Sequence, residues 1–362
     1  MELQKNDITL LRIQNSGLIT PFDNIESCIR NLVGIQSQAQ QFGEISILNR
    51  VENLKQEDLR QLYDSYDIIK IWGQRMTVHM YSKKDWKVIH QVYAHRNSFI
   101  KRGWQENKAT LEKLLLEIAQ LKTKQKIDKL EIAELIQNIA PHITNEYRDY
   151  SIIIQSTLDA ILFGIPQMPQ TKHFAHRSVC IDEDDFKAWG SNKEQSLHHL
   201  LSTYFRFYGP ATISDFRHWS GLTQREIQDC FSNLKNELIS VSVSGKNYYG
   251  YSENLQLSGW ENESIKLLGK FDPLFVSFSD KSWIATPEQQ KAIWRPAGHV
   301  EAVVLINGKL AGTWRYSIKG KKINFSIHPF LRITSSQKKK IAVEAKKIAQ
   351  FLEKQLDKIE YE

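Results

Sequence analysis

The spacing of apolar and polar residues predicts that the chain begins with several helices followed by a two-stranded hairpin. Apolar residues recur at three- or four-residue spacing in the predicted helices, and every second residue is apolar in the hairpin. The helices are expected at 7–15, 23–33, 40–50 and 57–65, and the strands at 68–72 and 75–81, with Gly73-Gln74 as the turn. Helices followed by a hairpin are typical of a winged helix, so residues 1–82 are predicted to form one.

The next part of the chain predicts a mostly helical unit. Residues 83–122 have an amphipathic helical pattern, and further helices are expected at Lys129–Ile139 and Glu146–Leu162. Pro166 ends the last of them, because the residue before a proline avoids the helical conformation. We interpret 83–165 as a second winged helix and 166–195, where loop-forming residues are frequent, as a linker.

The pattern is clearest in the third unit, at 196–252. A helix with Leu200, Leu201, Tyr204 and Phe205 on its apolar face ends at Gly209-Pro210. Two capping boxes, Thr212–Asp215 and Thr223–Glu226, then predict the starts of two more helices. Alternating residues at 239–243 and 248–251 predict the hairpin of another winged helix.

The remainder of the chain changes from a helical to a strand pattern. Asn307-Gly308 is a strong hairpin turn between strands at 300–306 and 309–316. We expect residues 253–335 to form a small β-barrel or a curled sheet, and 336–362 to form a C-terminal helix with a lysine-rich outer face. The predicted fold class is therefore α+β, with three tandem winged-helix units and a C-terminal barrel.

Composition limits the possible partners. The chain has 362 residues, of which 41% are hydrophobic, and a net charge of +7, which favours an anionic partner such as nucleic acid. The three cysteines are far apart and form no CxxC pair, so a reduced, cytoplasmic protein is expected. No histidine spacing is typical of a metal site, and no apolar run is long enough for a membrane helix. We therefore predict no metal, no cofactor and no membrane association.

One polar stretch, residues 36–41, carries four glutamines between two predicted helices. Gln36 and Gln38 are two positions apart, and that spacing at an irregular helix end could direct both amides into one cleft. Each amide offers an uncharged acceptor and two donors, which could hold a water molecule or contact a base edge. The alternative is a solvated turn between helices.

Several stretches together resemble the AlkZ-like DNA glycosylases, a winged-helix family that excises alkylated purines and unhooks interstrand crosslinks. Gly34-Ile35-Gln36-Ser37-Gln38 is similar to the family's catalytic Gln-x-Gln signature, although the family usually has an apolar residue where this chain has Ser37. The other matching stretches follow in the family's order and are Arg75–Met80, Tyr208–Thr212, Phe271–Leu274, Pro296–Val300 and Gly312–Arg315.

The resemblance implies three tandem winged helices and a β-barrel, bent into a C shape around DNA. It also implies a monofunctional hydrolase that cleaves the N-glycosidic bond of N7- or N3-alkylated purines. Unhooking of interstrand crosslinks is a further activity that the resemblance implies. The expected partner is double-stranded DNA containing alkylated purines, bound by a monomer.

Carried over to this chain, the catalytic residues are Gln36 and Gln38, where the two amides would orient the attacking water. A second register, Gln38-Ala39-Gln40, matches the apolar middle residue better, but it displaces Gly34 and Arg50 relative to the motif. We expect DNA contacts from Arg75, Thr77, His79 and Arg315. His79 could instead be a hairpin histidine bonded to a neighbouring carbonyl. Three acids are candidates to support the developing sugar cation, namely Asp272, Asp280 and Glu44.

Other classes of function remain open from the sequence. A non-catalytic tandem winged-helix protein, such as a transcriptional regulator, would bind duplex DNA and release no base. A protein-interaction scaffold would show no salt-dependent DNA affinity.

Overall fold

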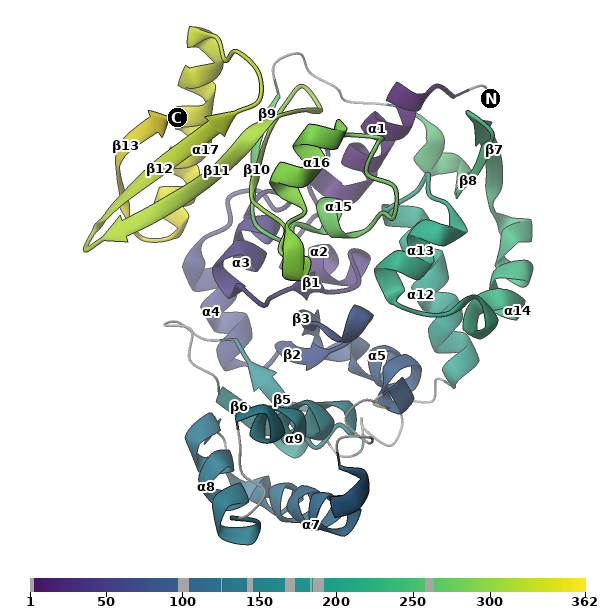
Figure 1. Cartoon of the computed structure of the whole chain (residues 1–362), viewed down its shortest axis with the longest axis vertical. Coiled ribbons are helices and arrows are strands. Elements are labelled where there is room, and N and C mark those ends of the chain that lie inside the picture. The colour runs from purple at the N-terminus through teal and green to yellow at the C-terminus, as the bar shows by residue number, and fades with distance from the viewer. Residues whose placement is uncertain are drawn as a thin grey trace. The chain divides into compact units, whose positions relative to one another are not determined.

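The computed structural model describes residues 3–96, 104–124, 126–141, 146–166, 173–182, 184, 192–257 and 264–362. The chain divides into two compact units, one made of Met1–Asp58 with Leu201–Glu362 and the other of Leu59–Leu200. The predicted mixture of helices and sheets is confirmed, and Figure 1 shows the elements of each unit.

The first unit begins with helices. Its first elements are α1 (Lys5–Ile13), α2 (Ile25–Asn31), the short strand β1 (Ile35–Gln36), α3 (Gln40–Leu48) and the start of α4 (Gln56–Asp64). A π-helical turn at Gln14–Leu18 continues α1, and Gly17 within it has a positive φ of 79°. A side chain at Gly17 would collide with the Phe22 ring, so the close approach of these segments requires glycine.

The chain returns to the first unit with a group of helices followed by a hairpin, as the sequence predicts. Its elements are α12 (Lys193–Phe207), α13 (Ile213–Ser220), α14 (Gln224–Leu234), β7 (Ile239–Val243) and β8 (Lys246–Gly250). Both predicted capping boxes are present, at Thr212 and at Thr223. Tyr204 lies at the centre of an aromatic core, with ring centroids 5.3 Å from Phe216 and 4.9 Å from Trp219.

The C-terminal strands form an open sheet, so the predicted closed barrel is wrong. The strand order is β13-β12-β11-β10-β9, which leaves β13 and β9 at opposite edges. The bounds are β9 (Ile265–Leu268), β10 (Val303–Ile306), β11 (Lys309–Lys319) and β12 (Lys322–Pro329), with the helices α15 (Pro273–Val276) and α16 (Pro287–Ile293) between β9 and β10. Helix α17 (Ser335–Phe351) packs against β9 instead of a further strand closing the sheet.

The predicted C-terminal helix is also too long. Helix α17 ends at Phe351, and Glu353 adopts a positive φ of 56°. The chain then forms β13 (Gln355–Tyr361), which runs parallel to β12 and places Leu356 beside Ile323, and Ile359 beside Phe325. These apolar cross-strand pairs stabilise a strand whose residues, taken alone, also fit a helical spacing.

The second unit contains a sheet with the strand order β3-β2-β5-β6-β4 and helices packed on it. Its strands are β2 (Ile68–Trp72), β3 (Val78–Ser82), β4 (Ile127–Asp128), β5 (Leu162–Ile165) and β6 (His173–His176). Its helices are α5 (Trp86–Tyr93), α7 (Lys108–Ala119), α8 (Lys129–Ile139), α9 (Glu146–Leu158) and α10 (Arg177–Cys180). The buried core includes Trp72, Leu114, Ile132, Ile152 and Phe174.

Two differences from the prediction fall in this second unit. Residues 162–165 and 173–176 form strands where a helix end and a linker were expected, and residues 167–172 between them lie outside the described part of the chain. Gly164 lies in β5 and pairs with Lys70, and a Cβ there would come within 3.1 Å of the Lys70 Cβ. The segment predicted as helical at 83–122 contains the helices α5 and α7. Its residues 97–103 lie outside the described part of the chain.

Candidate active site

The glutamine motif follows a tight helix end. Helix α2 stops at Asn31, after which Val33 and Gly34 both have positive φ values of 52° and 84°. The Gly34 amide donates to the Ile29 carbonyl at 2.8 Å, which reverses the chain and directs it into β1. A positive φ is rare for a β-branched residue such as Val33, so this turn is held in place by its surroundings.

The two glutamine amides meet. The Gln36 Nε2 donates to the Gln38 Oε1 at 2.8 Å. Gln36 is buried, with 6% exposure, whereas Gln38 is exposed. The hydroxyl of Ser37 between them is buried and makes no hydrogen bond within the described residues. The buried Gln36 amide therefore holds the exposed Gln38 amide through a hydrogen bond. The second lone pair of the Gln38 carbonyl can accept a hydrogen from water.

A second polar group lies within the helix that follows the motif. Helix α3 begins at Gln40, whose Nε2 donates to the Glu44 Oε1 at 2.8 Å. The Gln56 Nε2 lies 3.5 Å from the Glu44 Oε2, and the Glu44 side chain is fully buried. Gln40 thus bonds to Glu44 within its own helix, whereas Gln36 and Gln38 bond to each other.

The start of α3 is fixed against the C-terminal sheet of the same unit. The Tyr316 hydroxyl donates to the Gln41 Oε1 at 2.7 Å, and the Phe42 ring packs against the rings of Trp314 and Tyr316. Burial, followed by the nearby charge of Glu44, raises the pKa of Tyr316 to about 12. The hydroxyl therefore stays protonated and remains a donor at neutral pH, which keeps the segment after the motif in one position.

The three candidate acids have different surroundings. Both oxygens of Asp272 bind the Arg50 guanidinium, at 2.7 and 2.8 Å, in a fully buried pair. Asp280 forms a 2.6 Å ion pair with Lys246 on the β7–β8 hairpin. Glu44 is the candidate on the helix that directly follows the glutamine motif. The Arg50–Asp272 pair joins the segment just after α3 to the N-cap of α15.

Arg315 belongs to a cluster of three cations that surround one carboxylate. Its guanidinium lies 3.0 Å from Glu301, and Lys270 and Arg295 lie 3.4 and 3.8 Å from the same carboxylate. Glu301 is mostly buried, whereas the side chain of Arg315 is 56% exposed. Burial would raise the pKa of Glu301, but Lys270 and Arg315 lower it below its ordinary value. Three cations around one anion leave an excess of positive charge at this surface.

The other predicted DNA contacts, Arg75, Thr77 and His79, belong to the second unit. Arg75 and Met76 have consecutive positive φ values of 52° and 57° in the turn between β2 and β3. The His79 Nδ1 lies 2.9 Å from the Thr77 carbonyl, the hairpin bond that the alternative interpretation predicts. Burial, and secondarily Arg75, lowers the pKa of His79 to about 3. A neutral His79 that donates through Nδ1 presents Nε2 as an acceptor.

This pKa predicts a pH-dependent stability. The folded protein keeps His79 neutral, whereas the unfolded chain takes up a proton below pH 6.5, so the contribution of His79 to stability is lost as the pH falls from 6.5 towards 3. Relative to His79→Gln, the wild type should lose about 1.4 kcal/mol of unfolding free energy per pH unit in this window. Urea denaturation at several pH values measures this, and equal slopes for the two proteins would contradict it.

Comparison with known proteins identifies the class of protein to which this chain belongs. The protein is a DNA glycosylase, since the model of the family described as "DNA glycosylase AlkZ-like" matches residues 29–351. The chain belongs to this family, and the match includes the motif at Gln36 and Gln38. The alternatives of a transcriptional regulator and a scaffold are not favoured.

Two relatives come from Streptomyces sahachiroi. The curated "Interstrand DNA cross-link repair glycosylase" is 22% identical over 303 residues, covering 79% of this chain and 80% of that protein. The solved structure of S. sahachiroi DNA glycosylase AlkZ has a TM-score of 0.79 at 19% identity, and the match covers 99% of this chain and 100% of that one. The structural match establishes a shared fold.

Sequence reasoning missed some residues around the motif. Tyr316 contacts α3 from 275 positions away and Gln56 from 12 positions away, and no local pattern marks either of them. Glu44 was a candidate, but its bond to Gln40 could be anticipated only from their four-residue spacing on a helix. Among the described residues, no group of histidine, cysteine and acidic side chains could hold a metal ion, and no helix is long and apolar enough to cross a membrane.

Proposed function

We propose that this DNA glycosylase hydrolyses the N-glycosidic bond of purines alkylated at N7 or N3, with Gln36 and Gln38 as its catalytic residues. The observation that carries the proposal is the 2.8 Å bond from the buried Gln36 amide to the exposed Gln38 amide, in a chain of this family. We further propose that the chain contains three tandem winged helices, and that it acts as a cytoplasmic monomer on double-stranded DNA.

Neutral amides are sufficient because the lesion already carries the charge that drives the reaction. An N7- or N3-alkylated purine is cationic and leaves as a neutral base without protonation by a strong acid. The C1′–N9 bond (for N3- and N7-alkylpurines) breaks with its electron pair moving to the base, and a water oxygen bonds to C1′. The proton lost by that water passes to solvent. The enzyme must then mainly position the water and stabilise an oxocarbenium-like sugar.

The positions of the amides suit that task. The Gln38 carbonyl accepts one bond from Gln36 and has a second lone pair for a hydrogen of the attacking water. Bonding to Gln36 restricts the exposed Gln38 side chain before substrate binds, and such preorganisation lowers the entropic cost of positioning water. Glu44, on the helix that follows the motif, is the acid we propose to support the developing positive charge on the sugar.

We also propose interstrand crosslinks as substrates, in line with the printed name of the S. sahachiroi relative. A crosslink joins two bases covalently, which obstructs complete flipping of either base into a closed pocket. An exposed amide such as Gln38 suits a substrate that remains in an open groove.

The direct test is base release. The purified protein should liberate free 7-methylguanine from DNA containing that lesion and should separate the strands of a duplex carrying an N7–N7 crosslink. Chromatography of the released base and denaturing electrophoresis of the crosslinked duplex measure these two activities. Absence of any released base would contradict the proposal, whereas release without unhooking would limit it to monoadducts.

Backbone contacts are proposed at Arg315, Arg75, Thr77 and His79. Arg315 adds to the positive excess around Glu301, and phosphates favour such sites. Ala39, the N-cap of α3, provides no side-chain cap, and a helix N-terminus attracts phosphate. His79 would have to gain a proton, or change its bond to Thr77, before its ring could donate to a phosphate.

A charge-removal variant tests Arg315. Arg315→Gln should weaken binding to all DNA sequences equally and should reduce the slope of log affinity against log salt by about 0.9 for one lost phosphate contact. Lys309→Gln, at an exposed position on the same strand β11, is the matched control because it removes one positive charge outside the Glu301 cluster. Fluorescence anisotropy over a salt series measures both slopes. Identical slopes for the two variants would contradict a specific contact by Arg315.

A further inference from the structure

Helix α17 carries more than half of the net positive charge of the chain. Its 17 residues include five lysines and one glutamate, so the helix has a net charge of +4, whereas the whole chain has +7. The helix packs against β9 and β13 of the C-terminal sheet (Figure 1), and it also contacts α3, the helix that follows the glutamine motif. The charge is therefore concentrated in the same unit as the motif.

One side of α17 is apolar and the opposite side is basic. The buried side consists of small and branched apolar residues, namely Ile341, Ala345, Ile348 and Ala349. Four exposed residues are spaced by four, three and four positions and therefore share the outer face of the helix, namely Lys339, Val343, Lys346 and Gln350. Solvent thus meets a helix face that contains two lysines and no acid.

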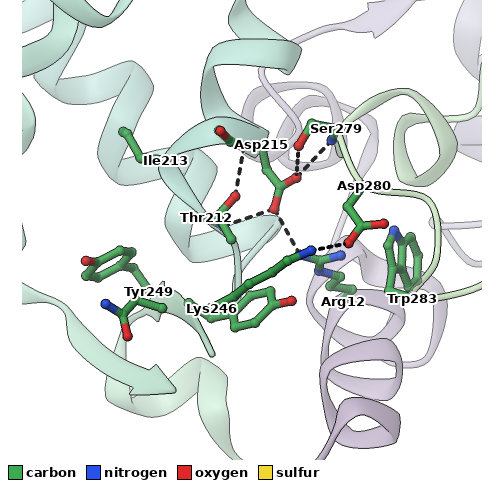
Figure 2. A pocket seen from close by; sticks show the side chains of 12 residues that line it. Arg12, Thr212, Ile213, Asp215, Lys246, Tyr249, Ser279, Asp280 and Trp283 are labelled. Carbon is green, nitrogen blue, oxygen red and sulfur yellow. Dashed lines mark hydrogen bonds and ion pairs between the residues drawn. The ribbon is translucent and has the colours of Figure 1, made fainter. Parts of the chain in front are cut away.

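The two lysines of the outer face have no acidic partner. Another exposed lysine of the first unit does have one, since Lys246 forms a 2.6 Å ion pair with Asp280 (Figure 2). Lys339 and Lys346, in contrast, make no ion pair with any residue that the structure describes. Both ammonium groups are therefore available to an external anion.

The single acid of α17 lies on the side of the helix that faces the sheet. Burial lowers the pKa of Lys266 on β9, and the negative charge of Glu344 opposes this shift, whereas Lys347 adds to it. Glu344 and Lys347 are both half-buried, so their charges act mainly beneath the helix. The outer face keeps its positive charge as a result.

The spacing of the two lysines fits a DNA strand. Lys339 and Lys346 are seven residues apart, which corresponds to about 10 Å along a helix axis. Successive phosphates of one strand advance by about 3.4 Å along the duplex, so three nucleotide steps cover about the same length. Lysine side chains are long and flexible, which allows both ammonium groups to reach phosphates of one strand.

We propose that the outer face of α17 binds the phosphate backbone of DNA outside the nucleotide that is attacked. A lysine ammonium attracts a phosphate as a point charge and does not read the sequence. The outer face should therefore contribute equally to the binding of damaged and undamaged duplexes. The inference rests on the proposed DNA partner, but it requires no catalysis by Gln36 or Gln38.

A double variant of the full chain tests the proposal. Lys339→Gln with Lys346→Gln should reduce the slope of log affinity against log salt by about 1.8, for two lost phosphate contacts. Over a fourfold rise in salt concentration, the wild type should then lose roughly 10-fold more affinity than the variant. Fluorescence anisotropy measures both slopes, with an undamaged duplex and with the same duplex containing 7-methylguanine.

Lys5→Gln with Lys55→Gln is the matched control, because it removes the same charge from exposed positions of the same unit. This control should keep the slope of the wild type. An unchanged slope in the α17 variant, or equal reductions in the two double variants, would overturn the proposal. Binding to the undamaged duplex does not depend on base release. A protein that binds this duplex through α17 but releases no 7-methylguanine would therefore support the inference and contradict the proposed function.

Val343 allows a second test that leaves both lysines in place. This residue is 64% exposed on the outer face, four positions after Lys339 and three before Lys346. In Val343→Glu the new carboxylate can pair with both lysines, so binding to either duplex should weaken. Val343→Gln has nearly the same shape without the charge and should bind as the wild type does. Equal affinities of the two variants would contradict a phosphate site on this face.

Discussion

Replacing Gln38 with alanine is expected to abolish most base release while leaving DNA binding intact. The exposed Gln38 amide is the proposed water-positioning group, and its truncation removes little buried surface. A positioned group that assists proton transfer typically contributes ~10²–10⁴-fold in rate. Single-turnover release of 7-methylguanine measures this effect, and fluorescence anisotropy with the same duplex measures binding.

Gln36→Ala should reduce the rate by a comparable factor, because Gln38 then loses the donor that holds its carbonyl. Gln61→Ala, an exposed glutamine on α4, is the matched control and should retain full activity. Gln40→Ala keeps the Gln36–Gln38 pair but removes the bond to Glu44. The alternative register is favoured only if Gln40→Ala loses excision while Gln36→Ala retains it. Intact excision by both Gln36→Ala and Gln38→Ala would show that the catalytic assignment is wrong.

Arg50→Met is expected to be the most destabilising of the substitutions considered. The Arg50 guanidinium binds both oxygens of Asp272 and also donates to the carbonyls of Ser16 and Ser46, at 2.7 and 2.9 Å. Both members of the pair are fully buried. Removing the cation leaves the Asp272 carboxylate buried and unpaired, a change that typically costs about 3–5 kcal/mol.

Urea denaturation followed by near-ultraviolet circular dichroism would report this loss. The double variant Arg50→Met with Asp272→Leu removes both charges and should be more stable than Arg50→Met alone. Arg30→Met is the surface control, because its pair with Glu26 is 3.8 Å long and solvent-exposed, and such pairs contribute at most about 1 kcal/mol. Equal losses for Arg30→Met and Arg50→Met would contradict the proposed role of the buried pair.

Local sequence determined those elements whose signals are short-range. The capping residues Thr212 and Thr223 satisfy the backbone amides at the starts of α13 and α14, so these helices begin where the sequence predicts. Helix α8 has the predicted bounds, Lys129–Ile139. The Asn307-Gly308 turn joins β10 to β11, because both residues accept the positive φ values that the turn requires. The two-residue spacing of Gln36 and Gln38 predicted that both amides could be directed into one cleft, and the structure shows a hydrogen bond between them.

Only the tertiary structure decided features that depend on distant partners. The spacing of Leu356 and Ile359 also fits a helix, but in the structure both residues pair with Ile323 and Phe325 of β12 and form a strand. The sheet stays open, and α17 packs against β9. Arg50 and Asp272 are 222 positions apart, and Tyr316 and Gln41 are 275 positions apart. No local signal in the sequence predicts either contact. Sequence by itself indicated the glutamine motif and the starts of capped helices, because backbone and capping preferences act over a few residues. Tertiary packing decided which amide is buried, which is exposed and what holds the motif in place.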